Sequence, residues 1–116
     1  LERYDEAILW LDKAMFEAPY LRDPFMERAL LAYKLQNWID VETYCLRALD
    51  IKAHGKSYIN EVFSWDGTVY DLLSLSCFYQ GRIHEALKWI DFAIEYNPDD
   101  ERLLKNKEIF EKDINE

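Results

Sequence analysis

The chain has 116 residues, of which half are hydrophobic and 16% aromatic, with only three glycines and three prolines. This length suits one compact domain, and the scarcity of glycine and proline favours helices over many short strands. The formal net charge of -9 repels nucleic-acid phosphates and anionic lipids, so we expect neither as a partner. The most apolar stretch, residues 63 to 78, is interrupted by Asp66, Gly67 and Asp71, and this excludes the ~20 apolar residues of a membrane span.

The first 20 residues predict an amphipathic helix near residues 1 to 18. Leu1 already lies inside the helical pattern and no capping residue precedes it, which predicts a piece of a larger protein. The segment 4–19 matches the segment 83–98 position by position. The coinciding residues are Ala7 and Ala86, Trp10 and Trp89, Leu11 and Ile90, Ala14 and Ala93, and Pro19 and Pro98.

Residues 22–53 predict a helical hairpin, with helices near residues 24 to 35 and 38 to 53. Asp23 can cap the first helix, and Pro24 suits its first turn. Ala48 in the second helix follows Ala14 by 34 residues. This spacing is the period of the tetratricopeptide repeat (TPR), so the first 20 residues correspond to the second helix of an incomplete repeat.

An insertion, residues 54–66, separates this hairpin from the next. Ala93 follows Ala48 by 45 residues instead of 34, and the extra residues include Tyr58, Phe63 and Trp65. One interpretation is that these rings fold back and fill a gap in the stack. The other is an ordered loop that contacts a partner or the rest of the parent chain.

Residues 67–98 predict a second complete hairpin, with helices near residues 67 to 80 and 83 to 96 joined by a turn at Gly81. Ala86 and Ala93 are small, and they allow the two helices to approach closely. Residues 99–116 predict a capping helix, near 99 to 114, with acids at its start and an apolar stripe of Leu103, Phe110 and Ile114. The expected fold is an all-α, antiparallel solenoid of TPR type.

A narrower resemblance starts in the insertion and continues beyond it. The series that carries it is Lys56-Ser-Tyr58-Ile59 with Glu61, Trp65-Asp-Gly67, Tyr70-Asp71-Leu72-Leu73-Ser74 and Asn97-Pro98-Asp-Asp-Glu101-Arg102-Leu103. This series resembles the C-terminal TPR region of family 2 glycosyltransferases. The resemblance implies an accessory arm that orients an acceptor or mediates self-association. The Asp-x-Asp metal motif and the nucleotide-binding sheet of those enzymes do not occur in this sequence.

The family's spacing places the groove of a TPR stack on the first helix of each hairpin. The residues expected to line it are Met26, Glu27, Leu30, Tyr33 and Lys34, and Asp71, Leu72, Leu75, Phe78 and Tyr79. The basic clamp by which some TPR domains hold a carboxylate is missing from the aligned positions. A partner that offers apolar or basic groups therefore fits better. Alternatively, these residues pack against a neighbouring part of the parent protein.

The sequence indicates no catalytic residues, no metal site and no cofactor. Cys45 and Cys77 lie on apolar helix faces without a second ligand at metal spacing, which favours buried, reduced thiols and a cytoplasmic location. His54 and His84 are expected on the surface. The acids 99–101 fit a helix start better than a cation site.

Two functions remain open at this point. The chain is either a non-catalytic arm of a glycosyltransferase that contacts its own catalytic domain, or a free-standing adaptor that binds a peptide in its groove. We also expect a homodimer, formed through the groove or through the first helix. In that helix, apolar residues among Ile8, Leu11, Met15 and Phe16 would lack a partner.

Overall fold

The computed structural model describes residues 2–51 and 67–115, and this part of the chain is helical with no strand. The helices are α1 (Glu2–Glu17), α2 (Arg22–Lys34), α3 (Trp38–Asp50), α5 (Thr68–Tyr79), α6 (Ile83–Tyr96) and α7 (Glu101–Asn115). The prediction of an all-α chain is confirmed for these residues. The insertion 54–66, with Tyr58, Phe63 and Trp65, lies outside them. Across the same ranges, no helix combines the length and the apolar character needed to cross a membrane.

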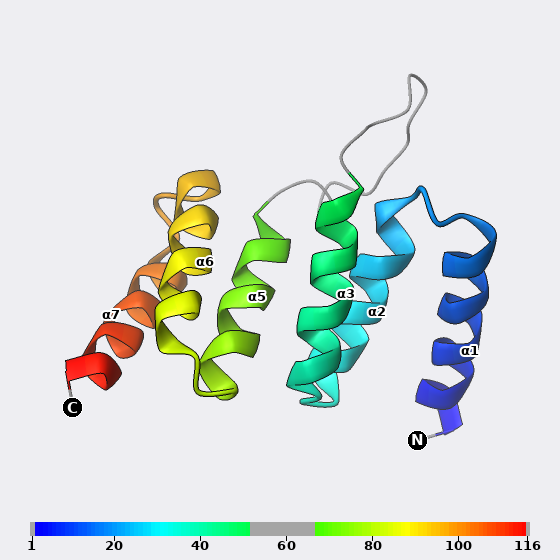
Figure 1. Cartoon of the computed structure of the whole chain (residues 1–116), viewed down its shortest axis with the longest axis horizontal. Coiled ribbons are helices and arrows are strands. Elements are labelled where there is room, and N and C mark those ends of the chain that lie inside the picture. Colours follow the sequence, from blue (N-terminus) through cyan, green and yellow to red (C-terminus); the bar gives the residue numbers. More distant parts are fainter. Residues whose placement is uncertain (1, 52–66, 116) are drawn as a thin grey trace.

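The helices stand side by side in chain order, with α1 and α7 at the two ends of the row (Figure 1). The most extensive contacts are between α2 and α3 and between α5 and α6, so these are two helical hairpins. Helix α3 packs on α5 and joins the hairpins, while α1 packs on α2 and α7 on α6. The body measures 45 × 36 × 21 Å.

The two hairpin turns have the same backbone geometry. Gln36 and Gly81, 45 residues apart, both have positive φ, 58° and 84°. In each turn the next residue donates its N–H to a carbonyl five residues earlier: Asn37 to Ala32 at 2.9 Å, and Arg82 to Cys77 at 2.9 Å. This is the Schellman ending of a helix. The turn predicted at Gly81 is confirmed, because its left-handed conformation is one that glycine adopts without strain.

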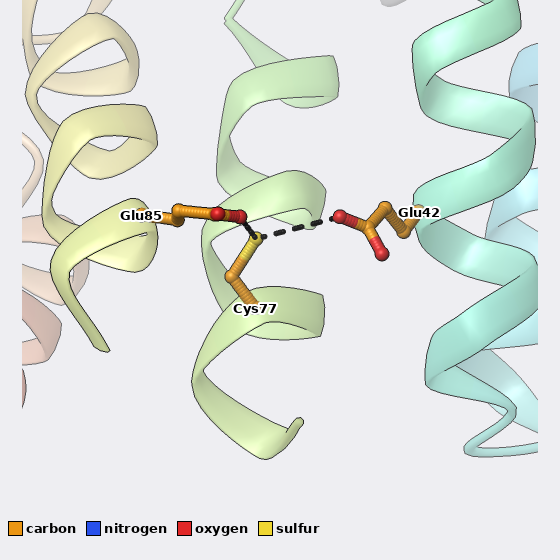
Figure 2. Close-up of side chains that lie close together, drawn as sticks. All are labelled: Glu42, Cys77 and Glu85. Atoms are coloured by element: carbon orange, nitrogen blue, oxygen red, sulfur yellow. Dashed lines mark hydrogen bonds between the residues drawn. The ribbon is translucent and has the colours of Figure 1, made fainter. Parts of the chain in front are cut away.

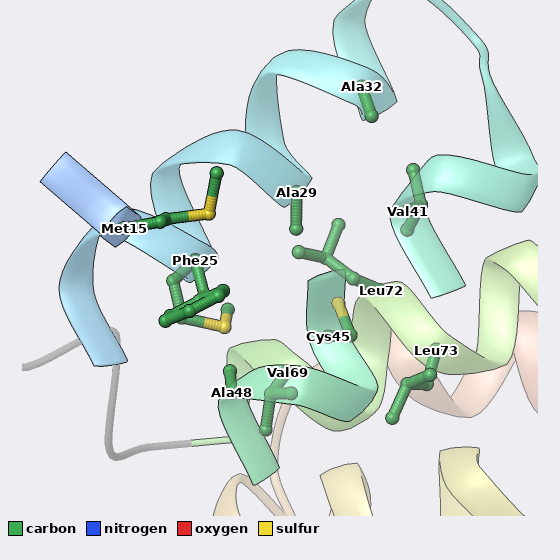
Figure 3. Close-up of a cluster of buried hydrophobic side chains, with 11 residues drawn as sticks. Met15, Phe25, Ala29, Ala32, Val41, Cys45, Ala48, Val69, Leu72 and Leu73 are labelled. Carbon is green, nitrogen blue, oxygen red and sulfur yellow. The ribbon is translucent and has the colours of Figure 1, made fainter. Parts of the chain in front are cut away.

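Small and apolar side chains fill the space between the helices. One core cluster joins α2, α3 and α5 and reaches Met15 of α1, as Figure 3 shows for Phe25, Cys45 and Leu72. A second cluster joins α5, α6 and α7. Ala86 and Ala93 are fully buried there, as predicted from the close approach of the hairpin helices.

The helix ends differ from the expected ones by a few residues. Helix α2 begins at Arg22, so Asp23 lies in its first turn and is not the N-cap, which is Leu21. Helix α7 begins at Glu101, after Asp100, whose Oδ1 accepts a hydrogen bond from the Arg102 N–H at 3.0 Å. Asp100 therefore precedes the helix and caps it, since a carboxylate satisfies a free N–H of the first turn.

Helix α7 covers the end of the second hairpin through part of its predicted stripe. Leu103 and Phe110 are buried, and Phe110 stacks on Phe78 of α5 with ring centroids 4.6 Å apart. Ile114, in the last turn, is 37% exposed, so it is only partly covered, unlike Leu103 and Phe110.

Candidate functional site

The most distinctive surface feature is an aromatic pocket formed by the end of α2, the start of α3 and the end of α5. Its volume is about 440 Å³. Four of its six lining residues were predicted groove residues, and the other two come from the α2–α3 turn and the start of α3. The lining consists of Tyr33, Lys34, Leu75 and Tyr79, together with Gln36 and Trp38.

Three rings form one wall of this pocket. Trp38 and Tyr79 stack nearly in parallel, with centroids 4.4 Å apart and an interplanar angle of 12°. Tyr33 meets Trp38 edge to face at 5.7 Å. Such pairs are favourable beyond their buried area, so the rings hold one another in place. Tyr33 and Tyr79 nevertheless remain 41% and 58% exposed, which leaves part of each residue accessible to a ligand.

The local sequence explains why Trp38 points into this pocket. The left-handed Gln36 ends α2, and Asn37 caps α3: its side chain accepts a hydrogen bond from the Asp40 N–H at 3.3 Å. The Asn37 amide also donates to the Asp40 carboxylate at 2.8 Å. These contacts fix the first turn of α3, so Trp38 starts that helix beside the last turns of α2 and α5.

The other predicted groove residues are distributed differently. Glu27 and Leu30 line a separate hollow of about 250 Å³ between α1 and α2, which Lys34 also borders. Met26 and Leu72 are 0% and 4% exposed, so their expected place in an open groove is wrong. They point into the α2, α3 and α5 core because that core, and not a groove, occupies the space between the hairpins.

Two predicted groove residues on α5 are covered by α7. The Asp71 carboxylate pairs with Arg102 of α7, and Phe78 packs beneath Phe110. Asp71 and Phe78 therefore contact α7 and not an open surface. Sequence spacing predicted four lining residues of the aromatic pocket, on α2 and α5, but it missed Trp38 and Gln36. No local signal marked these two residues, because glutamine at the left-handed position 36 does not indicate the turn that brings the start of α3 to this surface.

A second cluster joins three helices around Cys77. Its Sγ lies 3.9 Å from Glu42 Oε2 of α3 and 3.8 Å from Glu85 Oε2 of α6 (Figure 2). Arg82 pairs with both carboxylates, at 2.7 Å in the case of Glu85. Gln80 donates to Glu42 at 3.2 Å.

This cluster is an ion-pair network with its positive charge already supplied by Arg82. The three ligand atoms of Glu42, Cys77 and Glu85 lie within 4.8 Å of one another, a spacing that a metal ion could bridge. A cation would, however, have to displace Arg82 and deprotonate the thiol. Burial, opposed by Arg82 and reinforced by the two carboxylates, raises the pKa of Cys77 to about 11. The arrangement therefore favours a structural tie between α3 and the second hairpin.

Neither thiol has the character of a nucleophile. Burial raises the pKa of Cys45 further still, and both cysteines are buried and free, as predicted. His84 is exposed at the start of α6, in the expected position, while His54 lies outside the described residues.

Comparison with known proteins does not assign this chain to a family. No protein-family model matches the chain, and no curated protein matches it significantly. The interpretation of the pocket therefore depends on its own geometry.

Proposed function

We propose that this chain is a non-catalytic TPR-type scaffold that binds a peptide segment of a partner protein in the aromatic pocket. The observation that carries the proposal is the convergence of Tyr33, Trp38 and Tyr79, from three different helices, on one accessible pocket. The TPR assignment is supported by the two hairpins, by their matching turns 45 residues apart, and by the buried alanines at their crossing.

The chemistry of the pocket favours an apolar peptide with basic flanks. Flat aromatic rings with polar edges accept proline and aliphatic side chains, and they suit an extended peptide because its bound form costs little entropy. Leu75 adds an apolar wall, while Lys34 and Gln36 supply hydrogen-bond donors for peptide carbonyls. The net charge of -9 attracts basic partners and repels acidic ones.

We also propose that the chain has no catalytic activity of its own. Cys45 and Cys77 have raised pKa values, so neither is a thiolate at neutral pH, and the carboxylates beside Cys77 are held by Arg82. The assignment to a glycosyltransferase arm stays a prediction from sequence, since no family model and no curated protein matches the chain. In that setting the peptide would belong to the catalytic domain of the same protein.

Peptide titration tests the proposal. Labelled peptides that alternate proline and leucine, with either arginine or glutamate flanks, are titrated in a fluorescence polarisation assay. We expect the basic peptide to bind with a Kd of ~10 to 100 μM and the acidic one at least tenfold more weakly. Tyr79→Ser, at an exposed ring of the pocket, should weaken binding about tenfold or more.

The matched control is Tyr96→Ser, because Tyr96 is a similarly exposed tyrosine on α6, away from the pocket, at 53% exposure. It should bind as the parent protein does. Equal losses in Tyr79→Ser and Tyr96→Ser, or no binding of either peptide up to ~1 mM, would refute the assignment of this pocket as the binding site.

A further inference from the structure

Helix α1 has one covered face and one bare face within the described residues. Met15 belongs to the core cluster beside Phe25, so the expectation that Met15 lacks a partner is wrong. Leu9, Trp10 and Phe16 are 69%, 71% and 87% exposed. Phe16 is thus largely uncovered, as predicted, and it borders a hollow that it shares with Phe25 of α2 and Tyr44 of α3. Leu9 and Trp10 lie on a face lined by α1 alone.

Comparison of the internal repeats shows that Leu9 and Phe16 are apolar in α1, whereas the equivalent residues of α3 and α6 are polar. Trp10 aligns with Trp89 of α6, which stacks on Tyr70 of α5 at 5.9 Å, so a ring at this position is part of the repeat pattern. Leu9 and Phe16 have no such explanation. Their equivalents in α3 and α6 are all polar and exposed: Thr43, Asp50, Lys88 and Glu95. Apolar side chains at two positions that otherwise face solvent indicate a contact made by α1 alone.

The same face of α1 carries two opposite charges, Glu6 and Lys13. Glu6, Leu9, Lys13 and Phe16 recur at steps of three and four residues, so they share one side of the helix. Glu6, Leu9, Trp10 and Lys13 line a shallow hollow of about 240 Å³. Lys13 makes a long, exposed ion pair, 4.0 Å from Glu17, and its Nζ also lies 5.6 Å from the centroid of the Trp10 ring. Exposed contacts of this kind contribute little, so Lys13 can form a new ion pair.

We propose that this face binds a second copy of the chain, with the two α1 helices antiparallel about a two-fold axis between Leu9 and Trp10. In this register Leu9 of each copy packs on Trp10 of the other. Glu6 of each copy lies opposite Lys13 of the other, which gives two equivalent ion pairs. The two-fold axis makes the patch self-complementary, as an isologous dimer requires.

The alternatives on this face are less favourable. A parallel pairing would place Glu6 opposite Glu6 and Lys13 opposite Lys13, which is repulsive. The exposed rings and aliphatic groups supply roughly 400 to 500 Å² per copy, since a large aromatic side chain buries ~150 to 250 Å². Two copies together thus bury roughly 800 to 1,000 Å², which is the size of weak, transient interfaces. This area predicts a reversible dimer.

Analytical ultracentrifugation of the chain across ~5 to 200 μM tests the dimer. We expect a monomer–dimer equilibrium with a Kd of ~10 to 100 μM. Trp10→Glu and Leu9→Ser should each weaken it at least tenfold, because Leu9 and Trp10 pack on each other across the two-fold axis. Tyr79→Ser, in the aromatic pocket, is the matched control, and this variant should dimerise like the parent.

Charge exchange tests the register. Glu6→Lys and Lys13→Glu should each weaken the dimer roughly tenfold, because each turns two attractions into repulsions. The double variant should recover the parent Kd to within about threefold, since it restores the pairs in reverse. Circular dichroism checks that each variant keeps the parent helix content. A monomeric parent at ~200 μM, assembly beyond a dimer, or a double variant as weak as the single ones would overturn the proposal.

Discussion

Ala93→Leu is the sharpest test of how the second hairpin packs. Ala93 is fully buried in the cluster formed with Ile90 and Leu103. Its carbonyl lies 3.4 Å from the position that a Cβ on Gly67 would take, so the backbones are also close at this end of α6. A leucine adds three heavy atoms where no space is open. We expect a loss of ~1 to 3 kcal/mol in the free energy of unfolding, the usual cost of overpacking.

The assay is urea and thermal unfolding followed by circular dichroism. For a domain of this size, each kcal/mol lowers Tm by roughly 4 °C, so the variant should melt several degrees below the parent. Glu95→Leu is the matched control, because it places the same side chain two residues further along α6 at an exposed position. Its effect should stay within ~0.5 kcal/mol. If Ala93→Leu melts with the parent, the helix register derived from the repeat is refuted.

Three further predictions concern buried polar and ionisable groups. Arg22 donates from Nε to two backbone carbonyls at the end of α3, at 2.6 and 3.0 Å, so Arg22→Met should cost about 2 kcal/mol in denaturant unfolding. Because their pKa values are raised, Cys45 and Cys77 should react with iodoacetamide at pH 8 at least ~100-fold more slowly in the folded protein than in guanidinium. The hydrogen bond from Arg82 lowers the pKa of Glu42 from its ordinary 4.5, so the folded state resists its protonation. Stability should therefore decline as pH falls below 4.5 through the lower folded-state pKa, and Glu42→Gln should show a smaller decline between pH 7 and pH 3.

The sequence predicted the helical elements well because their determinants are local. Among the alanines that the repeat aligns, Ala48, Ala86 and Ala93 are fully buried and Ala7 and Ala14 are partly buried, and glycine at position 81 sits where φ is positive. Gln36 shows the limit of this reasoning. It occupies the equivalent turn with a φ of 58°, yet glutamine carries no signal for that conformation. Helix contacts in the rest of the hairpin impose it.

The site was harder to predict because it depends on contacts between distant residues. The spacing rule assigned Met26 and Leu72 to the groove, but it could not tell which side of a helix the neighbouring hairpin would cover. Cys77 was predicted to be buried, and it is. Its two carboxylate neighbours come from α3 and α6, and no local sequence pattern predicts that these three residues lie close together. Such clusters follow from how the hairpins stack.

The two proposed surfaces have a joint consequence. The aromatic pocket is formed by α2, α3 and α5, whereas the dimer contact uses the outward face of α1, so a dimer leaves both pockets open. A partner with two binding segments would engage the second pocket at a raised effective concentration, and its apparent affinity would exceed that of a single segment. Trp10→Glu should remove this gain while the affinity for a single segment stays unchanged. Tyr79→Ser should weaken both, because it alters the pocket itself. This difference separates avidity from intrinsic affinity, since only the former depends on the α1 contact.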